Sequence, residues 1–405
     1  AGEREFPKLG YAAQLMNNAG IMGAYEPQEL KEELSKLNAT CHVTADDDNL
    51  YIIMEGYEAT LPQACQLLSR QILMPKLDEK QLARLKGSAM GMRQQRKDNV
   101  SILNEALRQY MLYGEKSDYI KELTDKEIYE LQISELTGDI NRASNYEAKV
   151  FFTGTLPFDQ VYDILSKNLP LVANERPSNS PQAKEMMPVT ENTVYFLPNN
   201  DAEQAQIHLY IPMQKADKKD DVLRSAFNQY FGLDFTGIVL NEIREKRSMA
   251  YTAYAFVGTQ GIAGKASYLR GYIGTQNDKA NDALDVLMSL VNDMPKNPER
   301  IGNIKSYLRQ AMLTSHPSFR NKAMELVDLG YRGYTDDPAK ENLPKVDALT
   351  FDDIVKFYEE NIKGKPYCIS IMGNPKDIDL KRLEKFGKVV KLNERKLFNT
   401  KDALF

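Results

Sequence analysis

The chain has 405 residues, of which 42% are hydrophobic and 27% are charged, and its formal net charge is −5. This composition is typical of a soluble globular protein, and the length suits two or three domains. The mild acidity argues against a nucleic-acid partner, because such partners require clustered basic residues. No apolar run approaches the roughly eighteen residues of a membrane-spanning helix, so we expect a protein that is not embedded in a membrane.

The three cysteines, Cys41, Cys65 and Cys368, form an odd and sparse set that does not indicate a disulfide framework. They leave the compartment open between a bacterial-type cytoplasm and periplasm. The chain begins AGEREF, without an initiator methionine or a signal peptide, and a helical pattern follows almost at once. We therefore expect that an upstream segment is missing.

The first half of the chain mixes strands and helices in an irregular order. An amphipathic helix, LGYAAQLM, comes first; an alternating strand, NLYIIMEGY, follows, and two helices, ATLPQACQLLSRQIL and DEKQLARLKGSAMGMRQQ, come after it. The acidic run Asp46–Asn49 lacks the glycine and the later glutamate of an EF-hand loop, so it predicts a solvated hairpin tip. Helices grouped after strands favour an α+β fold over a doubly wound parallel sheet.

The second half repeats the order of the first. The stretch around Gly56 is a strand, a glycine turn and a helix, and so is the stretch around Gly274, 218 positions later. The pattern VFFTGTLPFDQVYDIL matches ISIMGNPKDIDLKRL, with Gly154 and Gly373 separated by 219 positions. These offsets predict an internal duplication, with two homologous α+β domains that each contain a mostly antiparallel sheet covered by helices.

Helix starts and a linker set the predicted boundaries. Thr124 in LTDKEIYEL and Thr350 in LTFDDIVKF are expected N-caps, each with acidic residues in the following turn. Their offset of 226 implies about seven extra residues in the first copy before its last strand. The proline- and serine-containing stretch NERPSNSPQAKEMMPVTEN is typical of a linker. We predict a first domain at 1–175, a linker at 176–190 and a second domain at 191–405.

The chain lacks the common self-sufficient catalytic motifs. There is no Walker loop, no G-x-G-x-x-G and no G-x-S-x-G nucleophile elbow. The three histidines do not pair at helical spacing. His42 adjoins Cys41 on a predicted strand, where neighbouring side chains point to opposite faces. His208 is expected in a strand and His316 in a turn.

The stretch NEIREKRSMAYTAYAF, together with the duplication and the order of elements, resembles the pitrilysin/insulinase family of zinc metallopeptidases, the inverted zincins. The resemblance spans nearly the whole chain, although this stretch is its most specific part. It implies an enzyme of four homologous α+β domains whose two halves close like a clamshell around a peptide. The catalytic half bears H-x-x-E-H and a distal glutamate that hold zinc.

This chain looks like the C-terminal, non-catalytic half of such an enzyme. At the positions of the family's metal helix it has Tyr11, Gln14 and Leu15, which supply neither zinc ligands nor a general base. No carboxylate lies between Glu79 and Asp98, where the distal ligand is expected. The resemblance therefore implies that this chain binds no metal. Zinc would be held by the N-terminal catalytic half, either upstream in the same polypeptide or on a separate subunit.

In the family's C-terminal domain, an arginine and a tyrosine seven residues apart reach the active site. They correspond to Arg244 and Tyr251 here, which would bind the substrate and its oxyanionic transition state. Arg247 and Tyr254 are the competing pair. In the purely structural alternative, Arg244 pairs with a surface acid and Tyr251 packs in a core.

These observations favour the substrate-binding, non-metal half of a zinc metalloendopeptidase that encloses and cleaves peptides. Such a chain is not expected to be active alone. Two alternatives stay open: an inactive relative that serves as a scaffold or assembly subunit, and a module that binds peptides at exposed strand edges.

Overall fold

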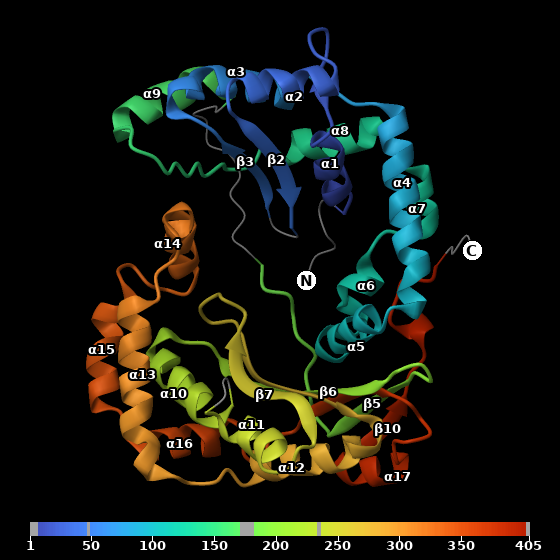
Figure 1. Cartoon of the computed structure of the whole chain (residues 1–405), viewed down its shortest axis with the longest axis vertical. Coiled ribbons are helices and arrows are strands. Elements are labelled where there is room, and N and C mark those ends of the chain that lie inside the picture. Colours follow the sequence, from blue (N-terminus) through green and yellow to red (C-terminus); the bar gives the residue numbers. More distant parts are fainter. Residues whose placement is uncertain (1–6, 47–48, 171–181, 233–235, 402–405) are drawn as a thin grey trace. The chain divides into compact units, whose positions relative to one another are not determined.

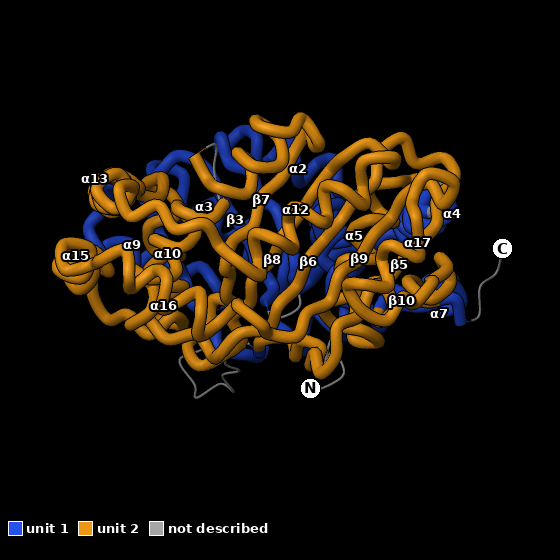
Figure 2. Tube along the Cα trace, turned by 90° about the horizontal axis from the view of Figure 1, so that it is seen from below, with its two compact units in different colours: residues 1–96, 122–182, 400–405 blue, residues 97–121, 183–399 orange. Residues whose placement is uncertain are grey.

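The computed structural model describes residues 7–46, 49–170, 182–232 and 236–401. They form two compact units (Figure 2). Unit 1 comprises residues 1–96, 122–182 and 400–405, and unit 2 comprises residues 97–121 and 183–399. Residues 97–121 thus belong to unit 2 although they precede the predicted linker. Residues 176–181 of that linker lie outside the described residues.

Unit 1 is mostly helical and contains two small antiparallel sheets, in which β1 pairs with β4 and β2 with β3. Its main elements are α1 (Leu9–Met16), β1 (Gly20–Ile21), α2 (Pro27–Lys36), β2 (Thr40–Ala45), β3 (Leu50–Glu55), α3 (Leu61–Leu73), β4 (Pro75–Lys76), α4 (Glu79–Gln94), α7 (Asp125–Glu130), α8 (Ile133–Ala143) and α9 (Phe158–Asn168). Figure 1 shows their order along the chain. The predicted hairpin tip closes β2 onto β3 through an Asp46 N–H that donates to the Asn49 carbonyl at 3.0 Å, and residues 47–48 within it lie outside the described residues.

Unit 2 contains a six-stranded sheet and most of the remaining helices. Its main elements are α5 (Val100–Tyr113), α6 (Asp118–Lys121), β5 (Thr193–Pro198), β6 (Gln204–Lys215), α10 (Asp221–Phe231), α11 (Ile238–Leu240), a π-helix (Asn241–Glu245), β7 (Ala250–Thr259), β8 (Ala266–Gln276), α12 (Ala280–Asn292), α13 (Ile301–Thr314), α14 (Lys322–Tyr331), α15 (Pro338–Ala348), α16 (Phe351–Asn361), β9 (Cys368–Gly373), α17 (Leu380–Leu383) and β10 (Lys388–Lys391).

The sheet of unit 2 is mostly antiparallel. Its strand order is β10-β5-β9-β6-β8-β7, and only the pairs β10–β5 and β5–β9 are parallel. The predicted mixture of helices with a mostly antiparallel sheet is therefore confirmed. The Thr124 and Thr350 N-caps are also confirmed, since each hydroxyl accepts the N–H of the residue three positions later, at 3.1 and 3.2 Å.

One expected strand is absent. The segment 150–154, VFFTG, was predicted as the last strand of the first domain, but the structure forms no strand there. The physical reason is the lack of a partner: within the described part of unit 1, β3 pairs only with β2, and no further strand lies beside this segment. An alternating apolar sequence becomes a strand only when a neighbour accepts its backbone hydrogen bonds.

The sheet of unit 2 has two faces that are covered differently. One face carries Ile207, Leu209, Leu269 and Ile273, which join the main core with α10, α12 and α16. The other face, called here the α5 face, packs against α5 only through part of its width: Met111 and Leu112 of α5 cluster with Tyr210 and Cys368. The described linker residues add to this contact, since the Met187 N–H donates to the Leu112 carbonyl at 2.7 Å.

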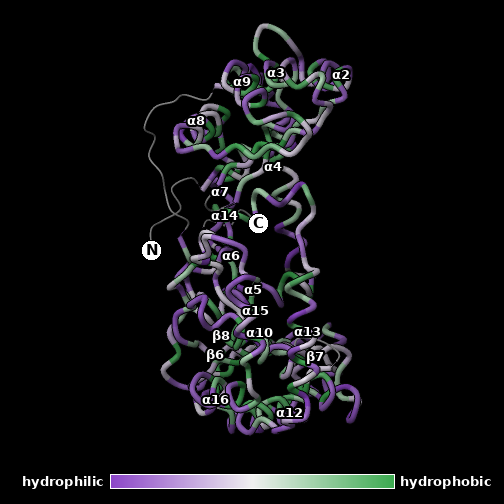
Figure 3. The backbone as a smooth tube through the Cα atoms, turned by 90° about the vertical axis from the view of Figure 1, so that its left-hand side faces the viewer, coloured by the Kyte–Doolittle hydropathy of each residue, from purple (hydrophilic) through white to green (hydrophobic). Residues whose placement is uncertain are grey.

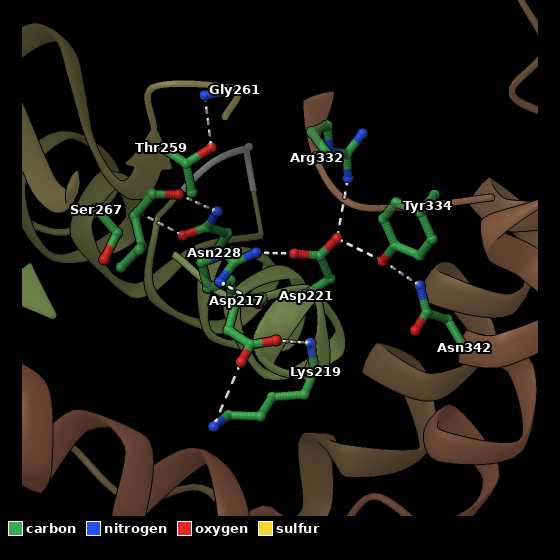
Figure 4. A network of polar contacts seen from close by, with 12 residues as sticks. Asp217, Lys219, Asp221, Asn228, Thr259, Gly261, Ser267, Arg332, Tyr334 and Asn342 are labelled. Atoms are coloured by element: carbon green, nitrogen blue, oxygen red, sulfur yellow. Dashed lines mark hydrogen bonds and ion pairs between the residues drawn. The ribbon is translucent and has the colours of Figure 1, made fainter. Parts of the chain in front are cut away.

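A polar network holds the first turn of α10 to the segment after α14 (Figure 4). The Asp221 carboxylate accepts hydrogen bonds from Arg332 at 3.0 Å and from the Tyr334 hydroxyl at 2.6 Å, and it pairs with Arg224. The Tyr334 hydroxyl in turn accepts from the buried Asn342 amide at 3.0 Å. The network thus joins α10 to Tyr334 and to Asn342 of α15 through the Asp221 carboxylate.

Figure 3 shows hydrophobic and hydrophilic segments that alternate along the chain. Among the described residues, no helix has the length and hydrophobicity needed to cross a bilayer.

His208 lies in β6, as predicted, and is almost fully buried. Its Nε2 lies 3.0 Å from Asn104 Oδ1 on α5, while its Nδ1 has no hydrogen-bond partner in the described part of the chain. Burial, reinforced by the nearby charges of Arg270 and Arg108, lowers the pKa of His208 from 6.5 to about 3. The imidazole is therefore neutral in the folded chain at ordinary pH.

This lowered pKa predicts acid sensitivity of unit 2. Between pH 6.5 and 3 the unfolded chain binds a proton at this histidine that the folded chain does not, so folding stability falls as the pH falls. The contribution of the one group is at most about 1.4 kcal/mol per pH unit. His208→Gln keeps a hydrogen-bonding side chain and removes the titration. Chemical denaturation from pH 7 to 4 should give a shallower loss of stability for this variant than for the wild type, and parallel curves would contradict the assignment.

Candidate functional site

The predicted arginine and tyrosine flank a tight turn between the π-helix and β7. The π-helix Asn241–Glu245 is anchored by the fully buried Ile243. Its end is closed by the Ser248 N–H, which donates to the Arg244 carbonyl at 2.8 Å, and by the Met249 N–H, which donates to the Ile243 carbonyl at 3.0 Å. Ser248 adopts a left-handed conformation with φ of 50°. Wide helical turns and left-handed non-glycine residues are uncommon and concentrate at functional sites.

Arg244 is held in place by its backbone and leaves its guanidinium available. Its side chain is 42% exposed, and its ion-pair partner is the adjacent Glu245, with Nε and Oε1 3.7 Å apart. An exposed pair at this distance contributes little to stability. Arg244 therefore does pair with a surface acid, as the structural alternative expects, but this ion pair is long and exposed.

Tyr251 sits on a β-bulge at the start of β7. Ala250 pairs with Thr275 of β8, and Thr252 pairs with Gly274, so Tyr251 is the extra residue in the ladder. Bulges redirect side chains and are frequent beside active sites. Tyr251 is 79% exposed, which excludes the alternative that it packs in a core. No hydrogen bond joins Arg244 to Tyr251, both of which the structure describes.

The competing pair is engaged in other contacts. The Arg247 guanidinium donates to the Glu242 carbonyl at 2.7 Å and pairs with the Glu242 carboxylate. Hydrogen bonds from Lys246 and Arg247 lower the pKa of Glu242. Tyr254 is half-buried, and its ring centroid lies 5.2 Å from that of Tyr272. These contacts make Arg244 and Tyr251 the more available pair.

The position of the expected metal helix is occupied by α1, next to a surface cavity of about 560 Å³. The cavity is lined by side chains of α1 and α4 and of the residues just after α1, and none of them is a carboxylate or an imidazole: Gln14, Leu15, Asn17, Asn18, Gln81, Arg84, Leu85 and Ser88. Tyr11 is partly buried, and desolvation raises the pKa of its phenol. Within the described ranges, no group of three or more His, Cys, Asp or Glu side chains could hold a metal ion. These residues do not fit zinc.

One feature of the α5 face was not recognised from the sequence. Tyr268, Arg270 and Tyr272 alternate along β8 on that face, while Leu269 and Ile273 point into the main core. The alternation in SYLRGYIG was visible, but only the strand order identifies the neighbours of Arg270.

Comparisons with known proteins agree with this fold. Residues 144–305 match a family model described as the peptidase M16 inactive domain. The resemblance to the pitrilysin/insulinase peptidases is thus confirmed, and the description agrees with a non-catalytic half. The sequence matches no curated protein.

Three solved structures illustrate the likeness. A peptidase M16 inactive domain from Pseudomonas fluorescens is 16% identical, with a TM-score of 0.69 over 94% of this chain and 92% of that one. The ferredoxin protease FusC, solved with Arabidopsis ferredoxin, is 12% identical, with a TM-score of 0.68 over 91% and 40%. Pitrilysin is 15% identical, with a TM-score of 0.66 over 96% and 41%. The chain thus spans about two fifths of FusC and pitrilysin. At these identities the likeness shows the fold.

The left-handed Ser248 predicts a stabilising substitution. Ser248→Gly should raise the free energy of unfolding by up to about 1 kcal/mol, because glycine adopts positive φ without the steric cost that other residues incur. Ser315→Gly is the matched control, since Ser315 has φ of −83° and glycine there only loosens the unfolded chain. Urea denaturation should separate the two variants. A loss of stability in Ser248→Gly equal to that in the control would contradict the strained turn.

Proposed function

We propose that this chain is the substrate-binding, non-metal half of a zinc metalloendopeptidase that encloses and cleaves peptides. In this proposal Arg244 and Tyr251 are supplied to the active site of a catalytic half that holds the zinc. The main support is the availability of Tyr251, which is 79% exposed on a bulge directly after the turn that carries Arg244. Their neighbours Arg247 and Tyr254 are engaged elsewhere.

The chemistry of the pair suits peptide hydrolysis. Attack on a peptide carbonyl creates an oxyanion, and preorganised donors aimed at that oxygen lower the barrier. Arg244 offers a permanent charge and a planar set of N–H donors, and Tyr251 offers a hydroxyl donor. Both stand on a rigid scaffold, since the turn is anchored by Ile243 and the bulge is paired to β8. Closure of two halves around a peptide would complete the site and exclude water.

Two alternative functions are considered beside this proposal. An inactive relative could serve as a scaffold or assembly subunit, which would leave Tyr251 without a role in turnover. A peptide-binding module would bind extended peptides with no partner present. The match to an inactive domain is compatible with each of these, whereas the exposure of Tyr251 just after the turn that carries Arg244 favours the peptidase half. The FusC structure, which contains ferredoxin, adds support for a polypeptide substrate.

We also propose that the two halves of the chain are duplicated copies, and matching hydrogen bonds support this. In unit 1 the Glu58 carboxylate accepts the Thr155 N–H, and in unit 2 the Asn277 amide oxygen accepts the Asn374 N–H. Each partner is 219 positions from its counterpart (277 minus 58, and 374 minus 155). The preceding glycines, Gly154 and Gly373, lie close against these same acceptors.

Helix caps suggest a better register for this duplication than the threonine pair. Gln132 and Thr350 each form a capping box before a helix of 11 residues, α8 and α16. They are 218 positions apart (350 minus 132), which agrees with the offset of the glycine turns. The pairing of Thr350 with Gln132 removes the need for the seven extra residues.

The proposal predicts a specific effect of Tyr251→Phe in an enzyme reconstituted from this chain and its catalytic half. Removal of one oxyanion donor should lower kcat by roughly 10² to 10³. The melting temperature should barely change, because the hydroxyl is exposed. Arg244→Lys should also lower kcat, since an ammonium does not reproduce the planar donor set.

The matched control is Tyr307→Phe, which alters another exposed tyrosine on α13. It should retain wild-type kcat and melting temperature. Wild-type turnover by Tyr251→Phe would remove this residue from the mechanism. A larger loss in Tyr254→Phe than in Tyr251→Phe would move the site to the competing register.

The residues at α1 predict that the purified chain holds no zinc and cleaves no peptide alone, because glutamine, leucine and a high-pKa phenol are poor zinc ligands. Elemental analysis after dialysis against a weak chelator should find far less than one zinc per chain. About one retained zinc per chain would overturn this expectation and indicate a site among other residues.

A further inference from the structure

Five residues of β7 and β8 form a patch on the α5 face, called here the aromatic face: Tyr254, Phe256, Tyr268, Arg270 and Tyr272. Arg270 lies directly between Phe256 of β7 and Tyr210 of β6, because it pairs with both across the ladders. Tyr254 pairs with Tyr272 in the same way. The ring centroids of Tyr254 and Phe256 are 5.9 Å apart. A single cation thus stands among aromatic rings.

Arg270 has no anionic partner among the residues that the structure describes. Its Nε is buried and makes no hydrogen bond. The other cations near this face are neutralised: Arg108 of α5 donates to Glu105 at 2.7 Å through its Nε, and Lys184 pairs with Asp118. An unpaired guanidinium in a partly desolvated position is costly unless an acceptor satisfies it.

The polar neighbours of Arg270 do not supply that acceptor. His208 is neutral and its Nε2 faces Asn104, while its Nδ1 and the Oγ of Ser370, opposite it in the ladder, make no hydrogen bond to any described residue, Arg270 included. The Tyr272 hydroxyl donates to Gln206. Among the described residues of this face, the charged group without a partner is therefore a cation, and the ligand that complements it is an anion. A carboxylate matches the planar donors of arginine in a two-point, charge-assisted contact.

The aromatic rings indicate what kind of molecule contains the bound carboxylate. Half-buried tyrosine and phenylalanine side chains beside Arg270 offer apolar area to the stem and neighbours of a bound residue. An extended peptide would place alternate side chains against such a face. The face therefore suits a peptide that presents one acidic side chain or its C-terminal carboxylate.

The spacing along β7 links this face to the proposed catalytic pair. Phe256, which is opposite Arg270, follows Tyr251 by five residues in one strand. At about 3.4 Å per residue this separation is roughly 17 Å. An extended peptide covers the same distance in about five residues.

We propose that Arg270 and the aromatic face form a subsite that binds a peptide carboxylate about five residues from the bond held at Tyr251. This inference rests on the proposed peptidase function and names its substrate class as peptides with an acidic group at that distance. Arg270 is then a specificity-determining residue, separate from the groups that act on the scissile bond.

Binding to the 405-residue chain tests the subsite without catalysis. The probes are pairs of fluorescein-labelled twelve-residue peptides. The two members of a pair are identical except at one position, which is Glu in one and Gln in the other, and this position differs from pair to pair. A second pair ends in a free carboxylate or an amide. Fluorescence anisotropy should show that one acidic placement binds about tenfold more tightly than its neutral partner, as expected for one charge-assisted contact. The pair that responds tells whether a side chain or the C-terminus is recognised.

Arg270→Gln should abolish this preference, and the variant should bind the Glu and Gln peptides equally. Arg395→Gln is the matched control, because it removes the same charge at an exposed position of unit 2 and should retain the preference. Equal binding of all peptides to the wild-type chain would overturn the subsite. So would a preference that survives in Arg270→Gln. Arg270→Lys, which keeps the charge, should retain part of the preference and guards against loss through misfolding.

Kinetics in the reconstituted enzyme separates the subsite from the proposed function. Arg270→Gln should raise KM for the acidic peptide about tenfold and leave kcat unchanged, whereas Tyr251→Phe lowers kcat. If Tyr251→Phe has no effect while the acidic preference depends on Arg270, the peptidase role fails and the binding subsite stands. If kcat falls in Arg270→Gln with KM unchanged, the subsite assignment is wrong.

Discussion

The antiparallel ladder of β6, β8 and β7 is the constraint on which the rest of unit 2 depends. Because side chains alternate along a strand, the pairing of Leu209 with Gly271 and of Ile207 with Ile273 commits one face to the main core. The residues between them must then lie on the α5 face. The same register places Arg270 between aromatic residues of the neighbouring strands. At the start of β7 it leaves one residue without a partner in β8, which forms the bulge. That extra residue is Tyr251, so its exposure follows directly from the pairing.

The helix before β7 complements the ladder. A buried Ile243 holds the π-helical turn to the core, and the backbone carbonyls of Ile243 and Arg244 accept the N–H groups that close it. The chain thereby presents Arg244 and Tyr251 from positions fixed by backbone contacts. Their side chains stay uncommitted, whereas most charged groups nearby are paired. Rigid support with free functional groups is the arrangement that preorganised catalysis requires.

The residues at α1 show the opposite pattern. The helix is amphipathic, and Leu15 packs in the core of unit 1. Its accessible side chains and those of α4 line a cavity with amides, a hydroxyl and a guanidinium. Such a lining offers hydrogen bonds but no negative charge for a metal. The proposed division of labour, with the metal on one half and the oxyanion donors on the other, fits the residues that line this cavity.

Local patterns in the sequence determined much of this structure. The strand in NLYIIMEGY and the helix caps at Thr124 and Thr350 depend on residues close together in the chain, and the structure bears them out. The sequence also indicated that α1 lacks metal ligands, since side-chain chemistry needs no geometry to judge. Only the tertiary structure decided the contacts between distant segments. In the structure, α5 belongs to unit 2, and VFFTG has no strand partner among the described residues. Tyr251 lies on a bulge, and Arg270 lies between aromatic residues of the neighbouring strands. The physical reason is that a local pattern sets backbone conformation, whereas burial and pairing depend on which distant residues arrive opposite.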